Sequence, residues 1–161
     1  MINVGILGAG YIGAVHLDQL SRLGSVRVKY VVDVNLDLAE KAAERYAVEN
    51  YSDDYDYRKV IIDPEIDIIH NCMPNKYHFS INKEALLAGK QVLSEKPLAM
   101  TLEEAEELCI IAAKKKAVTG VYFCYRYYPV LKAGVPMAEA FRPPVGGALF
   151  NKALPSGLLI S

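Results

Sequence analysis

Three glycines near the N-terminus have the types and spacing of a phosphate-binding loop. They lie in the string Gly8-Ala9-Gly10-Tyr11-Ile12-Gly13, between a short apolar run and a segment with helical periodicity. Gly8 allows a tight turn, Gly10 lets a pyrophosphate approach the backbone, and Gly13 lets the helix pack closely on the strand. The free amides at the start of the helix, where Tyr11 and Ile12 stand, then bind the anion. The sequence therefore predicts a dinucleotide loop, and the alternative is a glycine-rich turn that binds nothing.

Asp33 lies about 20 residues after Gly13, at the end of the next apolar run. A carboxylate there can accept hydrogen bonds from both ribose hydroxyls of NAD. A 2′-phosphate would instead place like charges about 4 Å apart, at a cost of roughly 1–4 kcal/mol. NAD is therefore favoured over NADP as the cofactor. The alternative role for Asp33 is an exposed cap at the end of a strand.

Apolar runs and helix-like segments alternate along the chain. Strands are predicted at residues 2–7, 26–32, 66–72, 91–94 and 118–123, and helices at 11–23, 35–47, 57–62, 77–88 and 101–113. Asn35 can cap the second helix, and Thr101 with Glu104 forms a capping box for the last one. This order predicts an α/β fold, a Rossmann doubly wound parallel sheet with right-handed crossovers. The polar stretch at 49–57 and the Pro- and Gly-rich segment after about Val130 show no strand pattern.

Composition excludes several classes of protein. The chain has 161 residues, a length suited to one domain, with 52% hydrophobic and 23% charged residues. Its formal charge is −1 and its longest basic run is Lys114 to Lys116, so nucleic acid is not expected as a partner. The three cysteines are far apart, so neither a metal site nor a disulfide is predicted, and all three are expected to be buried. The N-terminus is neither a signal peptide nor a membrane span, which leaves the cytoplasm as the default location.

Two further motifs carry a resemblance to a known family. They are Met73-Pro74-Asn75 with His78, within residues 69–78, and Glu95-Lys96-Pro97, within residues 85–99. Together with the glycine string and Tyr125-Arg126-Tyr127-Tyr128-Pro129, they resemble the Gfo/Idh/MocA family of glucose-fructose oxidoreductase and inositol dehydrogenase. The resemblance covers about residues 1 to 130 and implies an NAD(P)-dependent oxidoreductase that transfers hydride between nicotinamide and a sugar, inositol or related polyol.

The resemblance also implies roles for individual positions. Met73, Pro74 and Asn75 match a turn that passes under the nicotinamide and its ribose, and His78 matches a histidine of the same loop. In the second motif, Glu95 is expected near the nicotinamide ribose, Lys96 at the substrate hydroxyl as the catalytic residue, and Pro97 beside them. Arg126 matches an arginine near the carboxamide end of the cofactor. Independently, both motifs follow strands at the carboxyl edge of the sheet, where such folds bind ligands.

The two other histidines are left out of the predicted site. His16 falls inside the first helix and is expected to be a packed or surface residue. His70 falls within an apolar strand and is expected to be a satisfied core histidine.

The family continues into a second α+β domain that supplies the substrate pocket, further catalytic residues and oligomer contacts. The sequence therefore predicts a dinucleotide-binding domain at 1–125, followed by a truncated or frame-shifted remnant at 126–161. A homo-oligomer would lack its usual interface domain. Two functions stay open: the cofactor half of a dehydrogenase that is inactive by itself, or a non-catalytic dinucleotide-binding or regulatory module.

Overall fold

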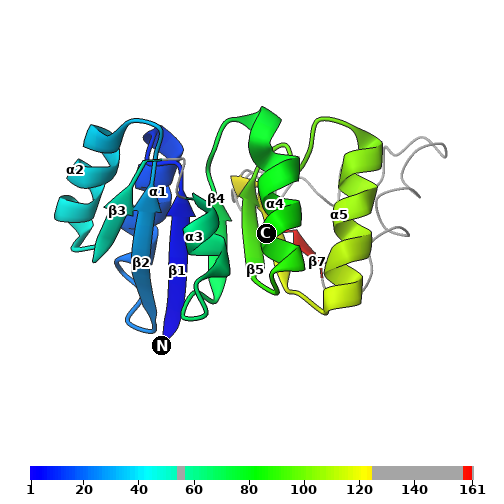
Figure 1. Ribbon diagram of the computed structural model, residues 1–161, viewed down its shortest axis with the longest axis horizontal. Coiled ribbons are helices and arrows are strands. Elements are labelled where there is room, and N and C mark those ends of the chain that lie inside the picture. The colour runs from blue at the N-terminus through cyan, green and yellow to red at the C-terminus, as the bar shows by residue number, and fades with distance from the viewer. Residues whose placement is uncertain (54–56, 125–157, 161) are drawn as a thin grey trace, which may run out of the picture.

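A single parallel sheet organises the chain. The computed structural model describes residues 1–53, 57–124 and 158–160, the last of these as backbone only. The strands run in the order β3-β2-β1-β4-β5-β6-β7 and every neighbouring pair is parallel (Figure 1). Their bounds are β1 (Ile2–Leu7), β2 (Val26–Val32), β3 (Asn50–Ser52), β4 (Ile68–Asn71), β5 (Gln91–Glu95), β6 (Thr119–Tyr122) and β7 (Leu158–Ile160). The predicted α/β fold with a doubly wound Rossmann sheet is confirmed.

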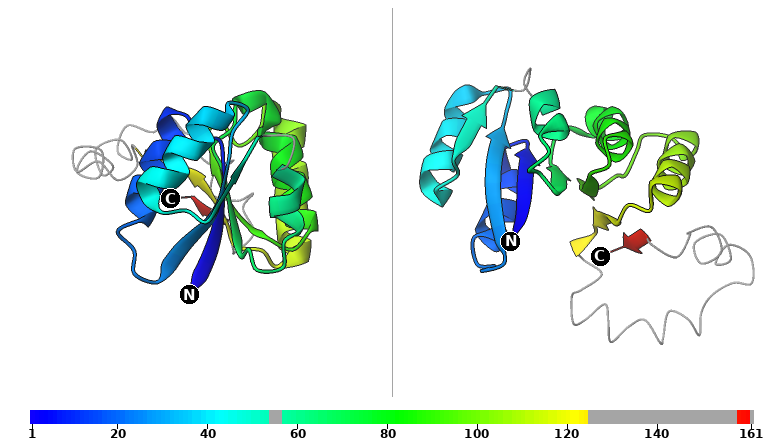
Figure 2. Two further views of the ribbon diagram at one scale, coloured as in Figure 1. Left: turned by 60° about the vertical axis from the view of Figure 1, so that its left-hand side comes forward. Right: turned by 60° about the horizontal axis from the view of Figure 1, so that its bottom comes forward.

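Helices cover both faces of the sheet (Figure 2). They are α1 (Tyr11–Leu20), α2 (Leu36–Tyr46), α3 (Tyr57–Ile62), α4 (His78–Leu87) and α5 (Leu102–Lys115), with a 3-10 turn, η2 (Asn75–Tyr77), before α4. On one face Leu17 of α1 and Ala39 of α2 share a core with Ile6. On the other, Ile81 of α4 and Leu108 of α5 pack in a second core. Residues 4–7 of β1 are therefore buried between the two cores, whereas the edge strand β3 is partly exposed.

The caps predicted at the starts of two helices are confirmed, whereas the first helix ends at Leu20 rather than at residue 23. The Asn35 side chain accepts a hydrogen bond from the Asp37 amide at 3.1 Å, which satisfies a free donor at the start of α2. Thr101 and Glu104 form both hydrogen bonds of the capping box that begins α5. Lys114 and Lys115 occupy its last turn, where cations complement the helix dipole.

The structure corrects three expectations. The polar stretch at 49–57 contains β3, which pairs with β2 through Tyr30 and Asn50. The segment after Val130, expected to hold no strand, contains β7, which pairs with β6. Both strands have three residues, too few to show alternation, and each joins a sheet edge whose backbone groups would otherwise lack partners. The three cysteines are free but partly exposed rather than buried.

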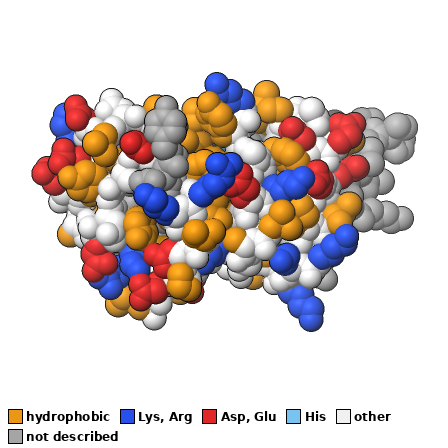
Figure 3. Space-filling view, viewed as in Figure 1, with side chains coloured by type: hydrophobic (Ala, Val, Ile, Leu, Met, Phe, Trp, Pro, Cys, Tyr) orange, Lys and Arg blue, Asp and Glu red, His pale blue; other side chains and the backbone are white. Residues whose placement is uncertain are grey.

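The helical face seen in Figure 3 carries charges of both signs side by side. Arg58 of α3 and Glu84 of α4 form a bidentate pair, with two N···O distances of 2.8 Å. Lys83 of α4 pairs with Glu107 of α5 at 2.6 Å. These pairs link the three helices of this face across their exposed sides.

The position of β1 sets the location of the site. β1 lies between β2 and β4, so the chain winds away from it in both directions, and such a switch point is where open parallel sheets bind ligands. Leu7 aligns with Val32 and with Asn71, and Asn71 aligns with Ser94. The residues that follow these strand ends therefore share one level at the carboxyl edge of the sheet.

Candidate functional site

A cleft of about 570 Å³ opens at the carboxyl edge of the sheet, beside β1. Its walls come from the glycine loop (residues 8–13), the end of β2 and the turn after β4. The lining residues are Gly8, Gly10, Tyr11, Ile12, Asp33, Val34, Cys72, Met73, Pro74, Lys76 and Tyr77. The structure thus brings together Asp33, two residues of the Met73 turn (Met73-Pro74-Asn75) and the predicted residues of the glycine loop except Gly13, which does not line the cleft.

The glycine loop has the shape that a pyrophosphate requires. Gly8 has a φ of +98°, and a side chain there would meet the Cys72 carbonyl oxygen at 2.6 Å. A side chain at Gly13 would overlap the Gly8 carbonyl, so helix and strand pack at their closest here. Gly10 is exposed and a Cβ at this position would meet nothing within 4 Å. The space over Gly10 is therefore open to an anion, and the residues present fit a bound dinucleotide.

Asp33 is buried and binds backbone on both sides of the cleft. One carboxylate oxygen, Oδ2, accepts a hydrogen bond from the Ala9 amide at 2.6 Å. The other, Oδ1, accepts from the Asn35 amide at 2.9 Å. Each carboxylate oxygen has two acceptor positions, so both keep capacity for a further donor such as a ribose hydroxyl.

Four residues of the lining were missed by sequence reasoning: Val34, Cys72, Lys76 and Tyr77. Lys76 follows the predicted Met73 turn directly, and its Nζ lies 4.7 Å from the centroid of the Tyr77 ring. The only sequence signal for Lys76 was its position, since it is a cation directly after a turn that was predicted to bind the ligand. Burial and the nearby negative charge of Glu95 raise the pKa of the Cys72 thiol, so this cysteine is not a nucleophile.

The lysine loop, Glu95-Lys96-Pro97, follows β5 and does not line the cleft. Lys96 and Pro97 are exposed and joined by a cis peptide bond. The Glu95 side chain is only 5% exposed, and its Oε2 accepts a hydrogen bond from the Lys96 amide at 3.2 Å. Arg126, the remaining predicted cofactor residue, lies outside the described residues.

His78 bridges the two predicted site loops from below. Its side chain is completely buried. Nδ1 lies 2.6 Å from the Pro97 carbonyl oxygen, and Nε2 lies 2.7 Å from the Met73 carbonyl oxygen. Both ring nitrogens therefore face backbone carbonyl oxygens, and a neutral ring donates its one N–H to one of them. His78 thus lies between the Met73 turn and the lysine loop.

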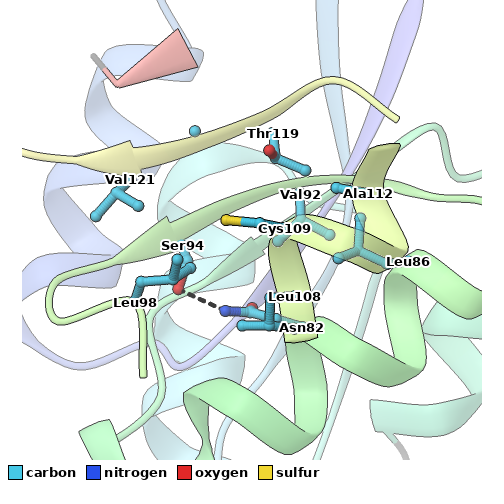
Figure 4. A pocket seen from close by; sticks show the side chains of 11 residues that line it. Asn82, Leu86, Val92, Ser94, Leu98, Leu108, Cys109, Ala112, Thr119 and Val121 are labelled. Atoms are coloured by element: carbon cyan, nitrogen blue, oxygen red, sulfur yellow. Dashed lines mark hydrogen bonds between the residues drawn. The ribbon is translucent and has the colours of Figure 1, made fainter. Parts of the chain in front are cut away.

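A buried polar chain supports the same loops on the α4 side of the sheet. The Asn71 amide donates to Asn82 at 2.8 Å. The Asn82 amide in turn donates to the Ser94 hydroxyl at 2.9 Å (Figure 4). Asn71 also accepts from the Met73 amide at 3.2 Å, and Ser94 donates to the Glu95 carbonyl at 3.1 Å. The sequence contained a signal for these hydrogen bonds, because polar residues stand inside apolar strands. Sequence reasoning missed this signal.

A second buried cluster lies on the α1 side. His16 Nδ1 lies 3.0 Å from His70 Nδ1, and His16 Nε2 lies 3.1 Å from Glu95 Oε1. Burial lowers the pKa of His70 to about 3, with a smaller contribution from His16. Burial also lowers the pKa of His16, and the hydrogen bond and negative charge of Glu95 oppose this shift. Both histidines are buried, as expected for His70. The two contact each other, and His16 also contacts Glu95 of the predicted site.

Metal sites and membrane-spanning helices are two further features that the described residues could have formed. Among residues 1–53 and 57–124, no three His, Cys, Asp or Glu side chains are grouped so that they could hold a metal ion. No helix in the described part of the chain has the length and apolar character needed to cross a membrane.

Several known proteins with similar sequences are named as oxidoreductases or dehydrogenases. An uncharacterised oxidoreductase of Bacillus subtilis, YrbE, is 35% identical over 81% of this chain and 38% of its own length. Levoglucosan dehydrogenase of Pseudarthrobacter phenanthrenivorans is 34% identical over 81% of this chain and 35% of its own. Inositol 2-dehydrogenase of Salmonella typhimurium is 32% identical over 88% of this chain and 44% of its own. The chain thus spans less than half the length of these relatives.

Solved structures show the same fold. A putative myo-inositol dehydrogenase from Sinorhizobium meliloti is 25% identical, with a TM-score of 0.76 over 86% of this chain and 42% of its own. The 3-ketoreductase KijD10 of Actinomadura kijaniata, solved with NADP, is 25% identical, with a TM-score of 0.77 over 86% of this chain and 44% of its own. The family described as an oxidoreductase family with an NAD-binding Rossmann fold matches residues 2–123. The chain therefore belongs to the Gfo/Idh/MocA family of oxidoreductases, of which it contains the NAD-binding Rossmann region.

Proposed function

We propose that this chain is the cofactor-binding part of an NAD-dependent dehydrogenase that acts on a sugar, inositol or related polyol. The observation that carries the proposal is the cleft at the switch point, where the exposed Gly10 backbone and the Asp33 carboxylate face one space. The named activities of two relatives, levoglucosan dehydrogenase and inositol 2-dehydrogenase, support the substrate class.

Each wall of the cleft would hold a different part of the dinucleotide. The amides of the glycine loop, with Tyr11 and Ile12 at the start of α1, would bind the pyrophosphate. Asp33 would accept hydrogen bonds from the adenosine ribose, and the Met73 turn would lie along the nicotinamide ribose. Glu95, Pro97 and Arg126 keep the roles that the family motifs imply, at the nicotinamide end. Bound NAD would supply the hydride acceptor for oxidation of an alcohol carbon.

Lys96 would act on the proton rather than the hydride. Its side chain is exposed at the carboxyl edge, free of the buried networks that fix the residues on either side. An ammonium or amine group there can hydrogen-bond the substrate hydroxyl and exchange its proton as the alcohol is oxidised. His78 would fix the backbone on both sides of the nicotinamide, through Met73 and Pro97.

A second function concerns the 161 residues by themselves. The chain spans 38% of YrbE and 44% of the Salmonella inositol 2-dehydrogenase. The part of those relatives that it does not match is where the family places its substrate domain. By itself, the 161-residue chain would act as a dinucleotide-binding module without turnover, because Lys96 alone does not position a polyol.

Calorimetry and turnover assays test the dinucleotide binding and the absence of turnover that both functions imply for the 161 residues. We expect the 161-residue chain to bind NAD more tightly than NADP and to produce no measurable NADH from glucose, levoglucosan or myo-inositol. Equal affinities, or tighter NADP binding, would contradict the cofactor assignment. NADH production that is lost in Lys96→Ala would show that the chain is a complete catalyst. Absence of binding to either dinucleotide would reject both functions.

A further inference from the structure

Three buried groups behind the lysine loop form one hydrogen-bonded unit. His16 comes from α1, His70 from β4 and Glu95 from the last position of β5. All three are at most 7% exposed. The two imidazoles meet edge to face, with 5.2 Å between ring centroids and an interplanar angle of 86°. None of the three lines the cleft, so dinucleotide contact with the cleft walls does not explain them.

The hydrogen positions in this unit follow from its chemistry. An ionised carboxylate only accepts hydrogen bonds, so His16 must donate to Glu95 from Nε2. A neutral His16 then has an acceptor at Nδ1, and His70 must donate to it from its own Nδ1. His70 is therefore held as the Nδ1–H tautomer, and the donors point in one direction from His70 to Glu95.

The same unit has room for one more proton but not for two. A proton that enters at His70 Nε2 lets the proton between the rings move to His16 Nδ1, with no change in the position of any heavy atom. His70 stays neutral and His16 becomes an imidazolium that pairs with Glu95. A second proton would place two N–H groups against each other across the 3.0 Å that separates the rings.

We propose that His16 and His70 are a coupled pair that positions Glu95, and that the pair exchanges a single proton behind the lysine loop. His16 fixes Glu95 Oε1, while Oε2 accepts from the Lys96 amide, so the pair holds the start of the lysine loop through the carboxylate. Its role in cofactor binding rests on the proposed function, since Glu95 is expected at the nicotinamide end of NAD.

Two further described residues, Tyr122 and Cys72, lie beside the pair or near its carboxylate. The Tyr122 ring of β6 packs on His16, with 4.6 Å between centroids. The Tyr122 hydroxyl accepts a hydrogen bond from the Gln19 amide of α1 at 3.2 Å. Cys72, which follows β4, carries a thiol whose pKa is raised by burial and by Glu95. An imidazolium charge at His16 would therefore lie directly against the Glu95 carboxylate.

Nitrogen NMR of the intact 161-residue chain tests the hydrogen pattern without any ligand. The chain has three histidines, so ¹⁵N-histidine labelling with one variant for each position assigns every ring. At pH 7 we expect His70 as the Nδ1–H tautomer and His16 as the Nε2–H tautomer. Between pH 8 and 4 the two rings together should take up no more than one proton. An Nε2–H tautomer at His70 beside a neutral His16, or two separate titrations of one proton each, would overturn the proposal.

Two substitutions at His70 test the positioning role. His70→Asn keeps a donor near the place of Nδ1, whereas His70→Leu removes it and leaves His16 Nδ1 without a partner. We expect NAD affinity within about three-fold of the original chain for His70→Asn and about ten-fold weaker for His70→Leu, since a lost hydrogen bond in a charged network has an effect of this size. Equal losses in the two variants would overturn the positioning role.

A failure of the NMR test can be distinguished from a failure of the affinity test. A chain that does not bind NAD rejects the proposed function, while its tautomers still decide whether the pair exists. A His70→Leu variant that does not fold leaves the test to the tautomer pattern and the proton count of the original chain. His16→Gln gives an independent check, because its amide keeps the donor to Glu95 and should preserve binding within about three-fold, whereas His16→Leu should not.

Discussion

The carboxylate of Asp33 accepts a hydrogen bond from the backbone amide of Ala9, at 2.6 Å, inside the glycine loop. The acidic residue expected to bind ribose therefore also fixes the loop expected to bind phosphate. Because Asp33 is 7% exposed, this hydrogen bond is shielded from water and ties the ends of β1 and β2 together. Cofactor choice and loop geometry depend on the same side chain.

Substitutions of Asp33 should therefore change affinity as well as selectivity. In Asp33→Ala the Ala9 amide loses its acceptor, so we expect binding of NAD to weaken by roughly ten-fold or more. The preference for NAD over NADP should shrink at the same time, because the charge that repels a 2′-phosphate is gone. Calorimetry with both dinucleotides measures the two effects. Asn35→Ala is the control: it should lower stability by about 1 kcal/mol through loss of the α2 cap and leave the preference unchanged.

Gly10 and Gly13 should respond to alanine in opposite ways. Gly10 has φ −62° and open space where a Cβ would stand, so Gly10→Ala should leave the free energy of unfolding nearly unchanged. The added methyl would occupy the approach of the pyrophosphate, and NAD binding should fall by more than about ten-fold. Gly13→Ala would instead drive a methyl into the Gly8 carbonyl and should destabilise the fold by several kcal/mol, or about 2 kcal/mol if the backbone relaxes. Urea unfolding and calorimetry on both variants decide this, and a destabilised Gly10→Ala would contradict the described loop.

Stability should fall as the pH is lowered from 7 to 5. Burial lowers the pKa of His70 to about 3, below its ordinary value of 6.5, so the unfolded chain binds the proton more readily. This contribution to stability is complete above pH 6.5 and is lost as the pH falls toward 3. The loss between pH 7 and 5 is about 2 kcal/mol for one such histidine. His16, whose pKa is also lowered, acts in the same direction. Urea unfolding at pH 5, 6 and 7 measures the slope, which should be shallower in His70→Asn.

Thr119 offers a stabilising substitution away from the site. Its Oγ1 is buried and has no hydrogen-bond partner among the described residues. It lies beside a small cavity of about 20 Å³, lined mainly by apolar groups such as Val92, Leu108 and Ala112 (Figure 4). Thr119→Val keeps the shape and removes the unpaired hydroxyl, so we expect a gain of about 1 kcal/mol. Thermal unfolding tests it, and a loss of stability would show that the cavity holds a water bound to the hydroxyl.

The sequence predicted most of the fold because its signals are local. The apolar run before Gly8, the Asn35 cap and the Thr101 capping box each depend on neighbouring residues, and all three are confirmed. The three-residue strands β3 and β7 were missed because pairing with an existing sheet edge, rather than their own pattern, makes them strands. Such pairing is a property of the folded sheet, which a window of sequence does not contain.

In the candidate site, too, the parts with local sequence signals were predicted and the parts that depend on distant residues were not. The glycine loop, Asp33 and the Met73 turn were predicted, and the structure brings them to one cleft. The groups behind them were not, because their partners are distant in sequence: 54 residues separate His16 from His70, and 79 separate His16 from Glu95. A polar residue in an apolar strand shows that a partner exists, and only the folded arrangement of α1, β4 and β5 shows which one it is.

The hydrogen bond from Ala9 to Asp33 also bears on how fast and how selectively a ligand would enter. A loop fixed by its own side chains loses little chain entropy when a ligand arrives, so less of the interaction free energy is spent on ordering. Binding should then approach rigid docking, with similar loop conformations before and after association. Differences in affinity among dinucleotides would consequently appear in their dissociation rates, while their association rates stay nearly equal.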